Sequence, residues 1–274
     1  MSHFYERMME KRIDILKEVE KIDALFNEEF GFYNHAYFTP FCDYLDETFR
    51  KLPIAYNNLS CKTIFTELKE ERMPLKEFFI NYCEFSATLL SQFIESRTIS
   101  PHDFNTVKNH IISILKLIDW DLEKLSLTRK TIESKLGKVT VIVPKDILLE
   151  EALSIANDKD VQDSLIVYKS TKLEGNVKEK EKILILLANY IEGITKNNEL
   201  KIKNLRLFDD INFLLNNFEI RHNNSEVNIK KYYEATLDER EEWLDLIYSE
   251  ILFVICSKKE NENHLKIEEL KQRV

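Results

Sequence analysis

The sequence has 274 residues and a net charge of −9, with 44% hydrophobic and 32% charged residues. This apolar content excludes wholesale disorder, and the acidic charge excludes broad electrostatic binding to duplex nucleic acid or anionic membranes. Only 4 glycines and 5 prolines occur. Because turn-rich all-β architectures need many such residues, their scarcity favours long helices.

Hydrophobic residues at three- and four-residue steps predict a first helix from Phe4 to Phe26 and a second from Phe41 to Leu52. A third helix is predicted from Pro74 to Glu95, since proline suits a first helical turn. The next helix is predicted to begin with Ser100 as its N-cap and Asp103 facing back. The N-terminal part should therefore be a helical domain.

The hydrophobic period changes between Leu127 and Pro144, where valines alternate with other residues after the turn residue Gly137. This pattern predicts a short β-hairpin. We place a domain boundary near it. The predicted division is a helical N-terminal domain at 1–125, a hairpin connector at 126–145, a helical bundle at 146–258 and a charged tail at 259–274.

The C-terminal half has the periodicity of a helical bundle. Two local patterns mark helix starts, Asn176 with Glu179 and Thr236 with Glu239. The acidic run 238–242 is interpreted as a solvated face. After Ser257 we expect either a frayed tail or a loosely held helix. The predicted helices cover about 147–157, 161–170, 177–194, 202–222 and 237–257.

Four cysteines, Cys42, Cys61, Cys83 and Cys256, lie far apart and form no CxxC pair. They are expected to be buried, reduced thiols. The N-terminus lacks an apolar signal segment, and the longest apolar run, 183–188, is too short to span a bilayer. We expect a cytoplasmic protein with no membrane partner.

The most suggestive chemistry lies at the end of the predicted helix 202–222. Arg221 and His222 follow Phe218 by three and four residues, so they continue the face predicted to be buried. A histidine that moves protons and an arginine that binds a phosphate suit phosphodiester cleavage without a metal. The alternative is structural, since cations are favoured at a helix C-terminus and Arg221 can pair with Glu219, with Glu226 or with the acidic start of the last helix.

The C-terminal half, roughly 144–257, resembles a HEPN-type four-helix bundle through the helix end Asn216-Asn217-Phe218-Glu219-Ile220-Arg221-His222-Asn223-Asn224. Members of that superfamily often place an arginine and a later histidine between the third and fourth bundle helices. Active members are metal-independent endoribonucleases, usually with a site composed across a dimer, and many serve in bacterial toxin or phage-defence systems. The resemblance matches Arg221 to the family arginine and puts Asn223 and Asn224 in its polar loop.

At the positions where the family histidine would fall, this sequence has Glu226, Val227 and Asn228. Either His222 or Glu226 takes the catalytic role, or the bundle keeps the fold for binding alone. The first hypothesis is an endoribonuclease that uses Arg221, His222 and Glu226, with Asn223, Asn224 and Asn228 binding RNA. The second is a non-catalytic helical adaptor or dimerisation module for a protein partner.

Under the first hypothesis we expect no cofactor and no metal, RNA as the substrate, a homodimer and a protein partner from the same operon. Sequence-specific DNA binding is disfavoured by the charge and by the absence of a basic recognition helix. His102 and His110 are eight residues apart, which is not metal-ligand spacing, so His110 is predicted at the edge of the core. Hydrophobic packing is favoured for Tyr33 and His35, with a binding role as the alternative.

Overall fold

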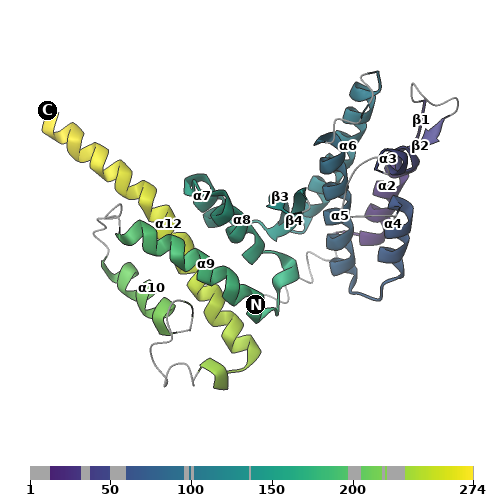
Figure 1. The fold of residues 1–274 in the computed structure, drawn as a ribbon. Coiled ribbons are helices and arrows are strands. Elements are labelled where there is room, and N and C mark those ends of the chain that lie inside the picture. Colours follow the sequence, from purple (N-terminus) through teal and green to yellow (C-terminus); the bar gives the residue numbers. More distant parts are fainter. Residues whose placement is uncertain are drawn as a thin grey trace. The chain divides into compact units, whose positions relative to one another are not determined.

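A computed structural model describes most of the chain, and its described part is mostly helical with two antiparallel β-hairpins, which agrees with the predicted all-α class (Figure 1). The chain divides into two compact units, residues 1–145 and 146–274. No helix among the described residues has the length and apolar character needed to cross a membrane. The described residues are 13–31, 38–49, 60–95, 99, 102–135, 137–196, 205–217, 220 and 232–273.

Five helices and two hairpins are described in the first unit. The helices are α2 (Ile15–Phe26), α3 (Phe41–Phe49), α4 (Cys61–Glu70), α5 (Leu75–Glu95) and α6 (Phe104–Lys124). The hairpins pair β1 (Glu29–Phe30) with β2 (Thr39–Pro40), and β3 (Leu127–Ser134) with β4 (Gly137–Pro144). Helix α5 thus begins directly after Pro74, and the hairpin predicted between Leu127 and Pro144 is confirmed.

Two helix starts differ from the prediction. Asp14 is extended (φ −87°, ψ 92°), and its side chain accepts a hydrogen bond from the Lys17 N–H, so α2 begins at Ile15. A continuous helix from Phe4 is therefore wrong at Asp14, while residues 4–12 lie outside the described residues. Helix α6 begins at Phe104 with Asp103 in the N-cap position, later than predicted. Ser100 lies outside the described residues.

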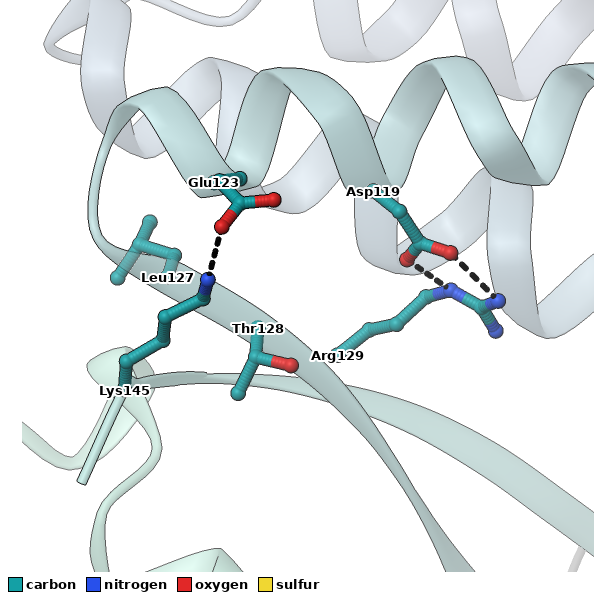
Figure 2. Close-up of a pocket in the computed structure, with 6 residues that line it drawn as sticks. All are labelled: Asp119, Glu123, Leu127, Thr128, Arg129 and Lys145. Carbon is teal, nitrogen blue, oxygen red and sulfur yellow. Dashed lines mark hydrogen bonds and ion pairs between the residues drawn. The ribbon is translucent and has the colours of Figure 1, made fainter. Parts of the chain in front are cut away.

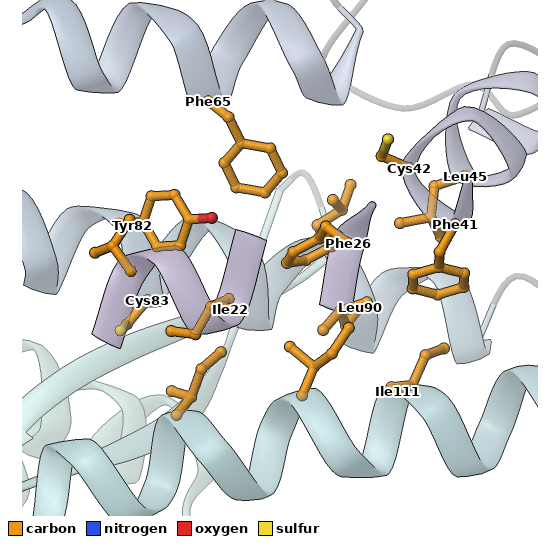
Figure 3. Packing of buried hydrophobic residues seen from close by; sticks show 14 of the residues in the cluster. Ile22, Phe26, Phe41, Cys42, Leu45, Phe65, Tyr82, Cys83, Leu90 and Ile111 are labelled. Carbon is orange, nitrogen blue, oxygen red and sulfur yellow. The ribbon is translucent and has the colours of Figure 1, made fainter. Parts of the chain in front are cut away.

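The core of the first unit is built from apolar faces of α2, α5 and α6, with aromatic rings from α3 and α4 closing over them (Figure 3). The Phe65 ring lies 4.9 Å from that of Phe26 and 5.0 Å from that of Tyr82, measured between centroids. His110 is 7% exposed, and its Nε2 lies 2.7 Å from the Leu25 carbonyl oxygen. The prediction that His110 sits at the core edge is confirmed.

Helix α5 holds the outer edge of strand β4 with polar side chains spaced four residues apart. Glu84 Oε1 accepts the Ile142 N–H at 2.7 Å, and Thr88 Oγ1 accepts the Thr140 N–H at 2.9 Å. One turn further, Gln92 Nε2 donates to the Lys138 carbonyl at 2.9 Å. A two-stranded sheet leaves such edge groups unpaired, and buried backbone donors need a partner. Side chains of one helix supply it here.

These bonds make the hairpin part of the first unit. Strand β4 packs on α5 and strand β3 on α6, and the division between the units falls after Lys145. Gly137 closes the turn with φ +94°, a left-handed conformation that glycine adopts without strain. The predicted connector, 126–145, therefore contributes buried surface to the N-terminal helices rather than standing between two domains.

The second unit is helical in all of its described elements. These are α7 (Ile147–Ile155), α8 (Lys159–Tyr168), the short 3-10 helix η1 (Thr171–Leu173), α9 (Val177–Lys196), α10 (Leu205–Asn217) and α12 (Leu237–Arg273). Helix α12 packs against α7, α9 and α10. It continues through the predicted charged tail to Arg273, so the helical alternative for this segment holds.

The predicted apolar stripes form the core of the second unit. Ile211 and Leu215 of α10 and Leu244, Ile247 and Ile251 of α12 are all fully buried. Both predicted cap patterns are confirmed. Asn176 Oδ1 accepts the Glu179 N–H at 3.3 Å, and Thr236 and Glu239 exchange backbone N–H bonds with each other's side chains at 3.2 and 2.8 Å.

Candidate functional site

The predicted site residues lie outside the described part of the chain. These are Arg221, His222, Asn223, Asn224, Glu226 and Asn228. Helix α10 ends at Asn217, and Ile220 lies in a bend. The predicted helix to His222 is therefore wrong, because the chain has left the helix before Arg221. The spacing from Phe218 consequently does not fix which face Arg221 and His222 occupy.

The predicted site residues lie in the segment 221–231, and the described residues on either side of this segment are buried in the second unit. Ile220, directly before Arg221, is 3% exposed, and Tyr232, the first described residue after the segment, is 1% exposed. The Tyr232 hydroxyl donates to Glu181 Oε1 on α9 at 2.5 Å. Burial and the Glu181 carboxylate raise the pKa of Tyr232, so the phenol stays protonated and keeps donating. The segment 221–231 thus connects two buried points.

Arg240 and Tyr233 form a cation–aromatic cluster with Tyr232, the residue that follows the segment 221–231. The Arg240 guanidinium carbon lies 5.2 Å from the ring centroid of Tyr232 and 5.8 Å from that of Tyr233. Both distances fall within cation–π range. The Arg240 Nε is buried and has no hydrogen-bond partner among the residues that the structure describes. Tyr233 is 57% exposed, which leaves part of an aromatic ring accessible beside the segment.

A buried lysine ties α9 to α12 on the same unit. Lys180 is 6% exposed, and its Nζ lies 2.7 Å from Glu241 Oε1 and 2.8 Å from Asp245 Oδ1. The Tyr168 hydroxyl also donates to Asp245, at 2.9 Å, and its ring stacks on Tyr248 with centroids 4.2 Å apart. Burial and the neighbouring Asp245 raise the pKa of Tyr168. This network joins helices and keeps its charges paired.

The interpretation of the acidic run 238–242 as a solvated face is wrong for Glu241. Its side chain is only 19% exposed, and Oε1 accepts bonds from Lys180 and from the Gly175 N–H at 2.8 Å. Asp238 and Glu242 are exposed, as predicted. Sequence reasoning missed Lys180 and Tyr232 as partners of the acidic groups, because each pair is more than 50 residues apart.

The first unit carries a cavity of about 340 Å³ where α6 meets the base of the β3–β4 hairpin (Figure 2). Arg129 makes two bonds to Asp119, at 2.6 and 3.0 Å, and Lys145 bonds Glu123 at 2.6 Å. Figure 2 shows the Thr128 hydroxyl between these two pairs. The lining charges are already paired with one another, so the cavity has no excess charge to attract an ionic ligand.

The described residues contain no group of three or more His, Cys, Asp or Glu side chains placed to hold a metal ion. Cys42, Cys83 and Cys256 are free thiols. Burial, with a smaller contribution from Glu151, raises the pKa of Cys256 to about 11. A thiol with so high a pKa is a poor nucleophile near neutral pH. Tyr33 and His35 lie outside the described part.

Comparisons of the chain with models of protein families, with curated proteins and with solved structures found no match. The support for a function therefore comes from the chemistry of the segment 221–231 and from the described residues that anchor it.

Proposed function

We propose that the second unit is a metal-independent endoribonuclease of the HEPN type that acts in the cytoplasm as part of a bacterial defence against phage. The observation that carries the proposal is the sequence Arg221-His222-Asn223-Asn224 in the segment between α10 and α12. That segment directly follows the buried Ile220 and precedes the buried Tyr232, so its ends are tethered to the bundle.

Arg221 would bind the scissile phosphate and stabilise the charge that develops on its oxygens. His222 would accept the proton of the RNA 2′-hydroxyl as that oxygen attacks phosphorus, with Glu226 as the alternative base. The bond between phosphorus and the 5′-oxygen would break, and the proton taken up by the base would pass to that oxygen, so the products are a 2′,3′-cyclic phosphate and a 5′-hydroxyl. Asn223, Asn224 and Asn228 would hydrogen-bond the single-stranded RNA through their amides.

The described surroundings of the segment suit single-stranded RNA. The half-exposed ring of Tyr233 offers a stacking surface to a base, and Arg240 places a cation beside it. Stacking on aromatic rings tolerates any base sequence. It therefore supplies affinity without the broad basic surface that an acidic chain lacks.

The proposal is tested by incubating the full chain with single-stranded RNA in EDTA. We expect cleavage with cyclic-phosphate ends, and we expect Arg221→Ala to abolish it. The matched control is Arg72→Ala, which removes an exposed arginine from the first unit and should leave cleavage unchanged. Equal cleavage by Arg221→Ala and the wild type would reject the assignment of Arg221.

We also propose that the protein is a homodimer and that it binds a protein partner from the same operon. These partners would fit a toxin-type component whose site is completed by a second copy and restrained by a regulator. Size measurement by light scattering and co-purification of the operon's proteins test the two statements separately.

A non-catalytic adaptor is the second candidate. It is favoured by the residues Glu226, Val227 and Asn228 at the positions where the family histidine would fall, and by half-exposed apolar side chains on α12 such as Phe253. This candidate predicts a defined oligomer or complex without RNA cleavage. Cleavage in EDTA that depends on Arg221 would exclude it.

A further inference from the structure

Helices α10 and α12 of the second unit share a face that combines exposed apolar side chains with carboxylates. On α12, Leu246 and Phe253 are each 50% exposed, and on α10, Phe213 is 59% exposed. Leu246, Glu250 and Phe253 follow one another by four and three residues, so they lie on one side of α12. Asp210 and Phe213, three residues apart, likewise lie on one side of α10. We call these five residues the α10–α12 face.

The two helices meet on this face at a pair of like charges. Helix α10 packs against α12 (Figure 1), and burial, together with the nearby carboxylate of Asp210, raises the pKa of Glu250. In the described part of the chain, neither carboxylate has a hydrogen bond or an ion pair with a cation. The α10–α12 face therefore carries negative charge that these residues do not neutralise.

Other carboxylates of α12 are neutralised within the unit. Glu241 and Asp245 both bind the buried Lys180 of α9, at 2.7 and 2.8 Å. The described residues thus supply a cation where α12 meets α9 and none where it meets α10. A half-buried carboxylate beside another one costs folding free energy. We therefore looked for a ligand that brings positive charge to Asp210 and Glu250.

The chemistry of the face selects the class of that ligand. A hydrated metal ion would leave the three apolar side chains exposed to water. RNA would bring phosphates against two carboxylates, and a second copy bound through the same face would set these carboxylates against their own equivalents. A cationic protein segment with apolar side chains satisfies both the charge and the apolar surface.

We propose that the α10–α12 face binds a basic amphipathic helix of a protein partner. The apolar side chains of that helix would cover Phe213, Leu246 and Phe253. A lysine or arginine between them would bind the carboxylates of Asp210 and Glu250. Two adjacent helices offer ridges and grooves on which a third helix packs. Apolar residues at i, i+3, i+4 and i+7 are the usual anchors of a helix bound in this way.

The inference rests on the protein partner proposed above and adds the surface and the chemistry that this partner uses. It does not depend on RNA cleavage, because binding is measured without RNA. Loss of cleavage in Arg221→Ala with binding intact would bear only on the enzyme. Loss of binding in Glu250→Lys with cleavage intact would bear only on the α10–α12 face. The two ideas can therefore fail independently.

The first experiment measures binding of synthetic peptides to the full chain by fluorescence anisotropy. The probe is a helix-forming peptide of about 18 residues, with leucines at i, i+3, i+4 and i+7 and lysines beside them. We expect it to bind the wild-type chain, and we expect binding at least about tenfold weaker when glutamates replace its lysines. A peptide of the same composition in scrambled order has no apolar side, and it should also bind at least about tenfold more weakly.

Variants of the chain locate the binding on the α10–α12 face. Glu250→Lys and Phe253→Ser should each weaken binding of the lysine peptide by about tenfold, because the first repels its lysines and the second removes an apolar contact. The matched controls lie in the first unit. Glu70→Lys changes an exposed carboxylate at the end of α4, and Phe38→Ser changes a phenylalanine that is 71% exposed. Both should bind as the wild type does, with circular dichroism to check the folding of all four variants.

A second experiment examines the carboxylate pair without any peptide. Because burial and Asp210 raise the pKa of Glu250, the ionised side chain destabilises the folded second unit near neutral pH. The neutral variant Glu250→Gln should therefore unfold at a higher urea concentration than the wild type. Its control, Glu70→Gln, should unfold at the wild-type concentration.

Four results would each overturn the proposal. The first two are a wild-type chain that does not bind the lysine peptide, and a scrambled peptide that binds as tightly as the amphipathic one. The third is equal binding by Glu250→Lys and Glu70→Lys. The fourth is a Glu250→Gln variant that unfolds at a lower urea concentration than the wild type, because the carboxylate would then stabilise its own unit.

Discussion

The hydrogen bond from the Thr140 N–H to Thr88 should contribute measurably to the stability of the first unit. Thr88 is 4% exposed and Thr140 is 2% exposed, and the N–H lies 2.9 Å from Oγ1. Thr88→Val replaces the hydroxyl with a methyl group of similar size, so it removes the acceptor without leaving a cavity. An unpaired buried N–H costs about 1–3 kcal/mol, and that is the expected loss in the free energy of unfolding.

The assay is calorimetry of the full chain, in which each kcal/mol should lower the midpoint of the N-terminal transition by about 2–4 °C. The matched control is Thr66→Val. The Thr66 hydroxyl donates to the Lys62 carbonyl on the exposed side of α4, so its loss should change stability by less than about 0.5 kcal/mol. If Thr88→Val proves as stable as Thr66→Val, the idea that α5 holds the edge of β4 is wrong.

Two further predictions concern the second unit. Lys180→Met should lower its free energy of unfolding in urea by about 1–3 kcal/mol, because Glu241 loses its buried partner. The control, Lys182→Met, breaks an exposed ion pair and should lower it by less than about 0.5 kcal/mol. Equal losses in the two variants would contradict the stabilising role of the Lys180–Glu241 pair. The Thr236 N–H and, to a smaller extent, the Thr236 hydroxyl donate to Glu239 and lower its pKa, so this cap should be complete above pH of about 4.3 and lost as pH falls through the lowered value. Thr236→Val removes the hydroxyl donor and should raise the Glu239 pKa; an NMR titration that finds this pKa unchanged would refute the contribution of the hydroxyl.

The parts of the fold that local patterns encode were predictable from the sequence. Thr236 and Glu239 bond each other over three residues, and Gly137 closes a hairpin whose valines alternate. The N-cap at Asp14 was also predictable, because aspartate is a favoured N-cap residue. It was missed because apolar residues at helical spacing continue on both sides of it, and that periodicity extended the predicted helix through a residue whose side chain ends it.

Contacts between distant residues were not predictable in the same way. Glu84 meets Ile142 across 58 residues, and Lys180 meets Asp245 across 65. Nothing in the spacing of either pair marks the partner, since many carboxylates and lysines could serve. Tyr232 likewise gains its role from burial beside Glu181. The site residues, from Arg221 to Asn228, remain a prediction from residue type.

The most direct test of the proposed function is cleavage of single-stranded RNA by the purified full chain in EDTA, with Arg221→Ala and Arg72→Ala measured side by side. We expect cleavage that ends in 2′,3′-cyclic phosphates for the wild type and for Arg72→Ala, and none for Arg221→Ala. A wild-type protein that leaves RNA intact, or an Arg221→Ala protein that cuts as fast as the wild type, would contradict the proposal.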